Sequence, residues 1–296
     1  MKMSSTSAVA LALGFILMSF TGQCYSQLQV GFYEGKCKFI DVETTVSSIV
    51  KQNFLKDPTI AAALIRMQFH DCFVKGCDAS ILLDGSSSEK TAPPNLSLRG
   101  FDVIDAVKSI VERFCPGVVS CADIISLATR DVIFLSGGGR YDVPTGRRDG
   151  FESLAQNVDL PSPTISVSDS IAKFAGKGLR ATDMVYLLGV PKTQQATILL
   201  NLDQNPLSSF IVDKSYYGQI LAHRGILQID QELALDPLTQ ATVTTIANGY
   251  DFNTKFGQAM VKLGAVQVLT GTQGEIRKSC RAINKPFSYV TINGNH

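Results

Sequence analysis

The stretch that decides the fold is Ile65-Arg66-Met67-Gln68-Phe69-His70-Asp71-Cys72-Phe73-Val74-Lys75-Gly76-Cys77-Asp78-Ala79-Ser80. Arg66 and His70 are four residues apart, so on a helix both side chains emerge from the same face. A neutral imidazole beside a fixed cation suits cleavage of a peroxide, because the imidazole moves a proton between the two oxygens while guanidinium stabilises the leaving oxygen. The alternative interpretation is an ordinary surface pair on an amphipathic helix.

The second half of this stretch is rich in oxygen donors around a glycine turn. Asp71, Asp78 and Ser80 supply side-chain oxygens, and the turn at Gly76 frees the carbonyls of Val74 and Gly76 itself. Clustered oxygen ligands suit calcium, although their spacing is not that of an EF-hand. A polar turn closed by Cys72 and Cys77 is the alternative interpretation.

The composition indicates a globular protein. The 296 residues are 45% hydrophobic and 18% charged, which is enough to bury a large core. The 27 Lys and Arg balance 26 Asp and Glu, so no basic field favours nucleic acid. We therefore expect a small or uncharged substrate.

The N-terminus has the layout of a cleaved secretory signal. Lys2 precedes an apolar run from Ala8 to Phe20, followed by small or polar residues. A membrane anchor would need about 20 apolar residues, so we expect no membrane association after cleavage. We assign residues 1–26 to the signal and 27–296 to a single mature domain.

Secretion favours disulfides over free thiols. Of the seven cysteines, Cys24 lies in the signal, which leaves an even set. Spacing alone leaves the pairing open, although a short loop closed by Cys72 and Cys77 is sterically reasonable. The six remaining cysteines are Cys37, Cys72, Cys77, Cys115, Cys121 and Cys280.

Apolar residues recur at helical spacing along most of the mature chain, with no comparable set of alternating strands. The sequence therefore predicts an all-α domain with long loops rich in Gly, Pro, Ser and Asn. The predicted helices run from Asp41 to Phe54, Pro58 to Phe69, Phe101 to Phe114, Cys121 to Phe134, Val167 to Ala175, Thr182 to Leu188, Lys214 to Ala222, Asp236 to Ala247 and Thr254 to Leu263.

The run from Arg66 to Asp84 resembles the distal-haem signature of class III plant peroxidases. Further blocks in the family's order are Glu89-Lys90-Thr91-Ala92, Arg99-Gly100-Phe101-Asp102, Val119-Ser120-Cys121-Ala122-Asp123, Gly146-Arg147-Arg148-Asp149-Gly150, Leu160-Pro161-Ser162-Pro163 and Gly274-Glu275-Ile276-Arg277-Lys278-Ser279-Cys280. Such ordered co-occurrence is very specific. The resemblance implies the plant haem peroxidase fold, in which two helical lobes enclose haem b.

The resemblance also implies a role for each matching residue. His70 is the distal acid and base, Arg66 stabilises charge, Asn95 orients His70, and Pro161 lines the channel for phenolic donors. The implied disulfides are Cys37–Cys115, Cys72–Cys77 and Cys121–Cys280. The implied distal calcium ligands are Asp71, Val74, Gly76, Asp78 and Ser80, with Glu89 linked to the site through hydrogen bonding.

One family segment is missing. After Gly189 the family continues into a Gly-Ala-His-Thr-like motif that bears the proximal haem ligand, whereas this chain reads Val190-Pro191-Lys192-Thr193. The only histidines are His70, His223 and His296, and none stands at the proximal position. The family's fourth cysteine pair, which follows that histidine, is absent as well. Loss of a complete pair indicates deletion of one contiguous segment near 189–203.

Residues that serve the proximal side of the family are still present. Asp230 matches the carboxylate that binds the proximal imidazole, and without that partner it is interpreted as a helix N-cap. Asp203, Ser208 and Asp213 resemble ligands of a proximal calcium site that we expect to be weak or empty. His223 is expected at a solvent-facing helix end rather than in the ligand's place.

Two functional hypotheses follow. By resemblance, the chain is a secreted haem peroxidase. Its expected partners are hydrogen peroxide and small phenolic reductants, and its expected state is a monomer. This function implies removal of hydrogen peroxide and phenolic metabolism in the cell wall, apoplast or vacuole. The alternative is a secreted calcium-binding protein without haem, because the proximal histidine is absent.

Overall fold

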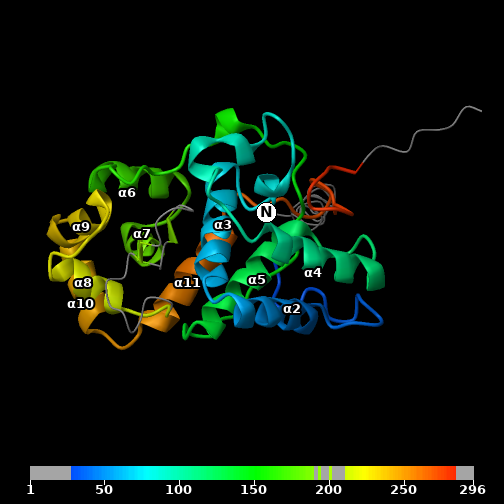
Figure 1. Cartoon of the computed structure of the whole chain (residues 1–296), viewed down its shortest axis with the longest axis horizontal. Coiled ribbons are helices and arrows are strands. Elements are labelled where there is room, and N and C mark those ends of the chain that lie inside the picture. The colour runs from blue at the N-terminus through cyan, green and yellow to red at the C-terminus, as the bar shows by residue number, and fades with distance from the viewer. Residues whose placement is uncertain (1–27, 190–192, 195–199, 202–210, 285–296) are drawn as a thin grey trace, which may run out of the picture.

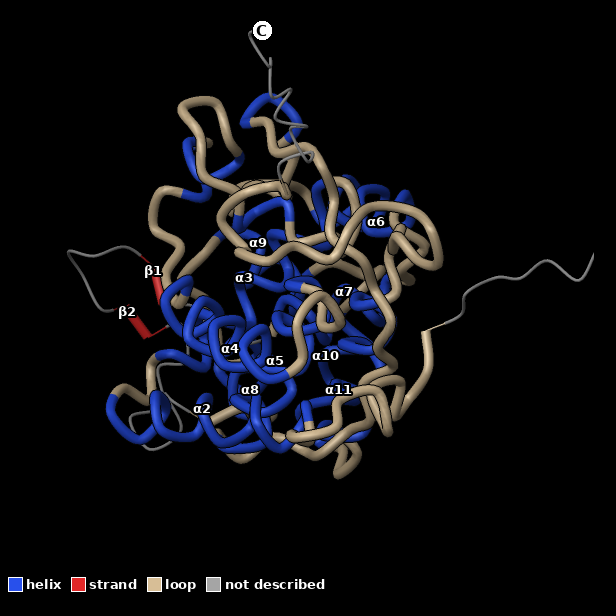
Figure 2. Tube along the Cα trace, turned by 90° about the vertical axis from the view of Figure 1, so that its right-hand side faces the viewer, coloured by secondary structure: helices blue, strands red, loops and turns tan. Residues whose placement is uncertain are grey.

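The computed structural model describes residues 28–189, 193–194, 200–201 and 211–284, and these residues form the all-α fold that the sequence predicts. Figure 2 shows helices joined by long loops. The one strand pair in this described part is an antiparallel ladder of β1 (Thr193–Gln194) and β2 (Leu200–Asn201). The α-helices are α2 (Val42–Lys56), α3 (Ile60–Val74), α4 (Phe101–Phe114), α5 (Cys121–Leu135), α6 (Val167–Gly176), α7 (Ala181–Leu188), α8 (Ser215–Leu221), α9 (Gln228–Leu235), α10 (Gln240–Asn248) and α11 (Phe252–Gly264).

The helices form two groups with the pair α3 and α11 between them (Figure 1). On one side, α5 packs against α2, α3 and α4, and on the other α8 packs against α9 and α10. Helix α11 joins the groups because it contacts both α7 and α3. The functional face of α3 therefore lies at the junction of the two groups.

Side-chain caps set the start of several helices. The Asp41 carboxylate accepts a hydrogen bond from the Thr44 amide at 2.7 Å before α2, and the Ser120 hydroxyl accepts one from the Asp123 amide at 3.1 Å in α5. Each satisfies an amide that has no partner within the helix. The predicted bounds of α4, Phe101–Phe114, agree with the structure.

The sequence patterns predicted no helix at α9 and placed the start of α10 too early. Asp230 is not an N-cap, because α9 begins at Gln228 and places Asp230 in its first turn. Acidic residues are favourable in both positions, since both lie near the positive end of the helix dipole. Asp236, the predicted start of the next helix, instead ends α9, and α10 begins at Gln240.

A buried ion pair holds the loop after α5 to the helix core. The Asp123 carboxylate accepts a hydrogen bond from Arg147 Nη1 at 2.7 Å and another from the Tyr33 hydroxyl at 2.6 Å. Asp123 also accepts hydrogen bonds from the amides of Gly146 and Arg147. Because both charges are buried, this dense hydrogen bonding is what offsets their desolvation.

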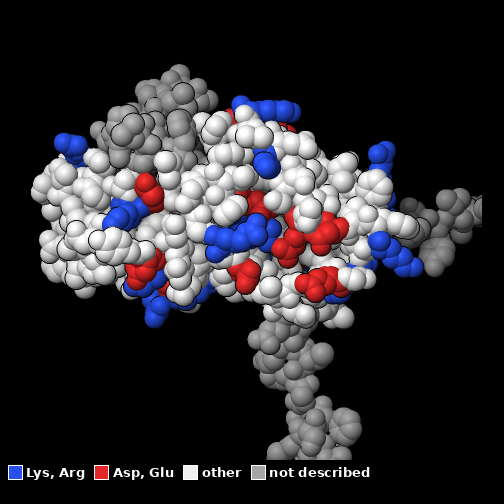
Figure 3. All heavy atoms as spheres, turned by 90° about the horizontal axis from the view of Figure 1, so that it is seen from below, with Lys and Arg blue, Asp and Glu red and all other residues white. Residues whose placement is uncertain are grey.

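The structure forms the three disulfides that the resemblance implied, Cys37–Cys115, Cys72–Cys77 and Cys121–Cys280. The predicted signal, residues 1–26, lies outside the described residues. Within them, no helix has the length and apolar character needed to cross a bilayer. On the face shown in Figure 3, acidic and basic side chains are interspersed, in keeping with the nearly balanced charge of the sequence.

Candidate active site

Helix α3 brings Arg66 and His70 together as their spacing predicts. Arg66 Nε donates a hydrogen bond to His70 Nε2 over 3.2 Å. The other ring nitrogen, His70 Nδ1, lies 2.6 Å from the side-chain oxygen of Asn95. Asn95 ends the short 3-10 helix Pro93–Asn95, so it reaches the imidazole from outside α3.

The hydrogen bonds of Asn95 determine which nitrogen of His70 carries the proton. Asn95 Nδ2 donates to the carbonyl of Glu89 at 2.8 Å, which leaves Asn95 Oδ1 as an acceptor facing the ring. His70 Nδ1 therefore donates, and Nε2 keeps its lone pair on the side of Arg66. Asn95 is only 2% exposed, so the asparagine of the Asn-Leu-Ser glycosylation sequon is buried, although Leu96 beside it is 71% exposed.

The environment keeps His70 neutral. Burial, together with the positive charge of Arg66, lowers the pKa of His70 to about 4, although the hydrogen bond with Asn95 opposes the shift. A neutral imidazole that keeps the lone pair on Nε2 is the form that can accept a proton.

Arg66 is held only by neutral groups in the described part of the chain. Besides His70, its guanidinium donates to the Ser97 hydroxyl at 3.0 Å and to the carbonyl of Pro94 at 2.8 Å. No described carboxylate lies within ion-pair distance of it. Sequence reasoning missed Ser97 because a contact across 31 residues of loop leaves no local pattern.

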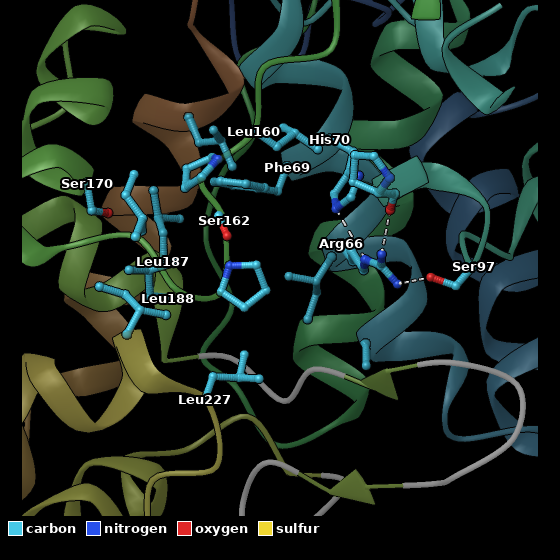
Figure 4. Close-up of a pocket in the computed structure, with 18 of the residues that line it drawn as sticks. Arg66, Phe69, His70, Ser97, Leu160, Ser162, Ser170, Leu187, Leu188 and Leu227 are labelled. Atoms are coloured by element: carbon cyan, nitrogen blue, oxygen red, sulfur yellow. Dashed lines mark hydrogen bonds between the residues drawn. The ribbon is translucent and has the colours of Figure 1, made fainter. Parts of the chain in front are cut away.

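These residues line a cavity of about 330 Å3 at the junction of the two helical groups. Figure 4 shows Arg66, His70 and Ser97 on one side of the cavity, with Ser170, Leu187 and Leu188 on the other. Pro161, the predicted channel residue, also lines it. An apolar cavity with a few polar groups is the common form of a small-molecule site.

The predicted calcium ligands gather behind the C-terminal end of α3. Asp71, Asp78, Ser80 and Glu89 are all buried. Asp71 Oδ2 accepts a hydrogen bond from the Ala79 amide at 3.1 Å, whereas Asp71 Oδ1 and both carboxylate oxygens of Glu89 have no hydrogen-bond partner among the described residues. Burial raises the pKa of Asp71 well above its usual range, and the charges of Asp78 and Glu89 add to the shift.

The turn between these ligands requires glycine. Gly76 has a φ of +107°, and a Cβ on it would lie 2.3 Å from the carbonyl oxygen of Gln267. The described residues contain no group of three His, Cys, Asp or Glu side chains with metal-binding geometry. A cation here would therefore draw on hydroxyl or carbonyl oxygens beside the carboxylates, as the proposed set of Asp71, Val74, Gly76, Asp78 and Ser80 does.

The residues that the sequence assigns to the proximal side do not gather into one site among the described residues. Asp230 is buried in α9 close to Tyr216 of α8, and its charge and hydrogen bonding add to burial in raising the pKa of Tyr216 well above its usual range. Asp213 accepts a hydrogen bond from the Ser215 amide at 2.8 Å. His223 is exposed after α8, as predicted. Asp203, Ser208 and His296 lie outside the described residues.

Comparison with known proteins decides the family. A family model described as peroxidase matches residues 46–249. Peroxidase 60 of Arabidopsis thaliana is 46% identical, with 97% of this chain and 99% of the relative covered. The chain belongs to the plant peroxidase family. Peroxidase 57 of Arabidopsis thaliana is 45% identical over 88% of this peroxidase and 94% of its own length, and Peroxidase N1 of Nicotiana tabacum is 40% identical over 86% and 90%.

The alignment with Peroxidase 60 also bears on the length of this peroxidase. It spans 331 positions, whereas the chain has 296 residues, so at least 35 positions, the difference between the two, have no residue here. This agrees with a chain that lacks a segment of its family.

Proposed function

We propose that this chain is a secreted peroxidase that uses hydrogen peroxide to oxidise small phenolic donors. The observation that carries the proposal is the chain of contacts from Asn95 through His70 to Arg66 at the edge of an apolar cavity. Family membership supports the same reaction, because the relatives are named peroxidases.

The distal residues can move a proton once the His70 Nε2 lone pair is released from its hydrogen bond with Arg66 Nε. His70 Nε2 accepts a proton from one oxygen of the peroxide and returns it to the other oxygen as the bond between them breaks. Asn95 holds the ring so that Nε2, rather than Nδ1, faces the peroxide. Arg66 donates its N–H groups to the oxygen on which negative charge develops.

The residues of the cavity fit haem on the distal side only. The apolar walls, the neutral His70 and the guanidinium of Arg66 suit it. The family's proximal imidazole is absent from the sequence, and neither Asp230 nor the exposed His223 lines the cavity. When bound, haem supplies the redox chemistry, and an axial ligand tunes its reactivity.

Calcium belongs to the same proposal. The buried and partly unpaired carboxylates of Asp71 and Glu89 support a cation behind α3. The carbonyl of Glu89 binds Asn95, so an occupied site would steady the residue that orients His70. The phenolic donor would enter past Pro161. The signal at residues 1–26, the mature domain of 27–296 and the destination in the wall, apoplast or vacuole remain part of this proposal.

The test is reconstitution with haemin, calcium and a glutathione couple, followed by the Soret spectrum and the oxidation of a phenolic dye. We expect peroxide-dependent turnover that His70→Ala abolishes and that Ser168→Ala, on the exposed side of α6, leaves unchanged. A spectrum of free haemin without turnover would overturn the proposal and favour a calcium-binding protein without enzymatic activity.

A further inference from the structure

One short loop segment contacts both members of the distal pair. Asn95 binds the ring of His70, whereas the residues on either side of Asn95 bind Arg66. The Pro94 carbonyl accepts a hydrogen bond from Arg66 Nη2 at 2.8 Å. The Ser97 hydroxyl accepts one from Arg66 Nη1 at 3.0 Å, and Figure 4 shows it directed at the guanidinium.

The backbone of this segment is held in place without any contribution from Arg66. Pro93 and Pro94 each have a fixed φ, which removes much of the freedom of the loop. The Asn95 amide donates to the Ala92 carbonyl at 2.8 Å, and the Leu98 amide donates to the Asn95 carbonyl at 2.9 Å. The segment can therefore act as a rigid frame for the longer side chain of Arg66.

The contacts of Arg66 fix its guanidinium without cancelling its charge. Each of the three guanidinium nitrogens donates one hydrogen bond, with Nε bound to His70 at 3.2 Å. All three acceptors are uncharged. A carboxylate at position 97 would hold the guanidinium more strongly, but it would neutralise the charge that has to stabilise the leaving oxygen. Neutral acceptors suit a cation that must be both fixed and available.

The contact with His70 is the one that has to open during the reaction, because it occupies the lone pair of His70 Nε2. Once it opens, only the contacts with Ser97 and Pro94 hold the guanidinium among the described residues. The contact with Pro94 is exposed, whereas the contact with Ser97 is partly buried. An arginine side chain has many rotamers, so its position then depends mainly on Ser97.

We propose that Ser97 is a positioning residue that keeps the guanidinium of Arg66 beside His70 while leaving its charge free. Ser97 thus does for Arg66 what Asn95 does for the imidazole. The role in catalysis rests on the proposed function, because it serves the step in which peroxide is cleaved. The anchoring of Arg66 is a property of the chain itself and is measured without haemin.

The first test is NMR of the side-chain Nε–H of Arg66 in the full chain without haemin. In Ser97→Ala we expect its order parameter to fall below about 0.6, the range of flexible groups. Ser97→Thr keeps the hydroxyl and should preserve the natural value. Ser168→Ala, the same change on the exposed side of α6, is the control. The signal of the His70 Nδ1 proton should persist in every variant, which separates release of Arg66 from unfolding.

The second test uses the chain reconstituted with haemin and separates the two substrates. Ser97→Ala should lower kcat/KM for hydrogen peroxide by about tenfold, as loss of a hydrogen bond to a charged group provides. It should leave kcat/KM for the phenolic dye unchanged, because peroxide and phenol react in separate steps. Ser97→Thr should restore the value for peroxide.

The proposal is overturned if the order parameter of Arg66 is unchanged in Ser97→Ala, or if it falls equally in Ser97→Thr. An equal loss of kcat/KM for both substrates would also overturn it, because that loss indicates general damage to the site. Absence of turnover in the natural chain would contradict the proposed function. The NMR comparison would still decide whether Ser97 anchors Arg66, so the two failures are distinguishable.

Discussion

His70 Nδ1 lies 2.6 Å from Asn95 Oδ1, although 25 residues separate the two in the chain. This contact orients the ring and leaves Nε2 unprotonated beside Arg66. Asn95→Ala should therefore lower peroxide-dependent oxidation of a phenolic dye by about tenfold to a hundredfold, in the range seen when a supporting hydrogen bond is removed. Asn157→Ala, which removes an exposed amide that binds Glu152, is the matched control. Equal rates in the two variants would contradict the orienting role.

The pKa of His70 is expected to shape the stability of the chain. Its folded-state value of about 4 lies below the ordinary 6.5, so the folded protein holds this ring neutral while the unfolded chain takes up a proton. The free energy of unfolding should fall as pH drops from about 6.5 towards 4, and His70 should contribute no pH dependence above that window. Urea unfolding of the natural chain and His70→Gln checks this, because the variant should lose part of the acid sensitivity. An NMR titration midpoint of His70 near 6.5 would contradict the shift.

Calcium should stabilise the chain most strongly at neutral pH. Burial is the main cause that raises the pKa of Glu89 to about 7, and the charge of Asp78 acts in the same direction. Without calcium, folding therefore becomes less favourable as pH rises from about 4.5 to 7, because the carboxylate must ionise while buried. Calcium offsets that cost. We expect the melting temperature in a chelator to be lower at pH 7.5 than at pH 5, and calcium to remove the difference. Magnesium, which demands a smaller site, is the control.

The buried pair of Asp123 and Arg147 should be essential for folding. Asp123→Ala leaves the guanidinium of Arg147 buried without its carboxylate, which typically costs about 3–5 kcal/mol. Asp159→Asn removes an ion pair with Lys173 in which the Asp159 side chain is 82% exposed, and little change is expected from it. Chemical denaturation measures both variants. A similar small loss in both would show that the buried pair is dispensable.

Restoring the missing segment should give the bound haem a proximal histidine ligand. We expect a chimera that carries the family's Gly-Ala-His-Thr-like segment between Gly189 and Thr193 to bind haemin with the spectrum of a histidine-ligated haem. The unmodified chain should lack that spectrum, since neither His70 nor the exposed His223 can take the proximal position. A chimera whose inserted histidine is replaced by Ala is the control. If the unmodified chain already shows the histidine-ligated spectrum, another residue serves as the ligand.

The spacing of residues in the sequence was enough to predict helix bounds and contacts within one helical turn. The periodicity of residues 101–114 predicted α4 to the residue, and the spacing of Arg66 and His70 predicted their contact on α3. The absence of a proximal histidine is also a fact of the sequence. These features depend on neighbours within one helical turn, or on which residues are present at all, so they require no knowledge of packing.

Only the tertiary structure decided which distant groups meet. Sequence patterns could not place the Ser97 hydroxyl on Arg66 or bring Asp230 beside Tyr216. Each of these contacts joins separate helices or loops, and their relative positions follow from the packing of whole apolar faces. Asp230 illustrates the difference, since an acidic residue suits both an N-cap and a first turn, and only packing against α8 shows its partner.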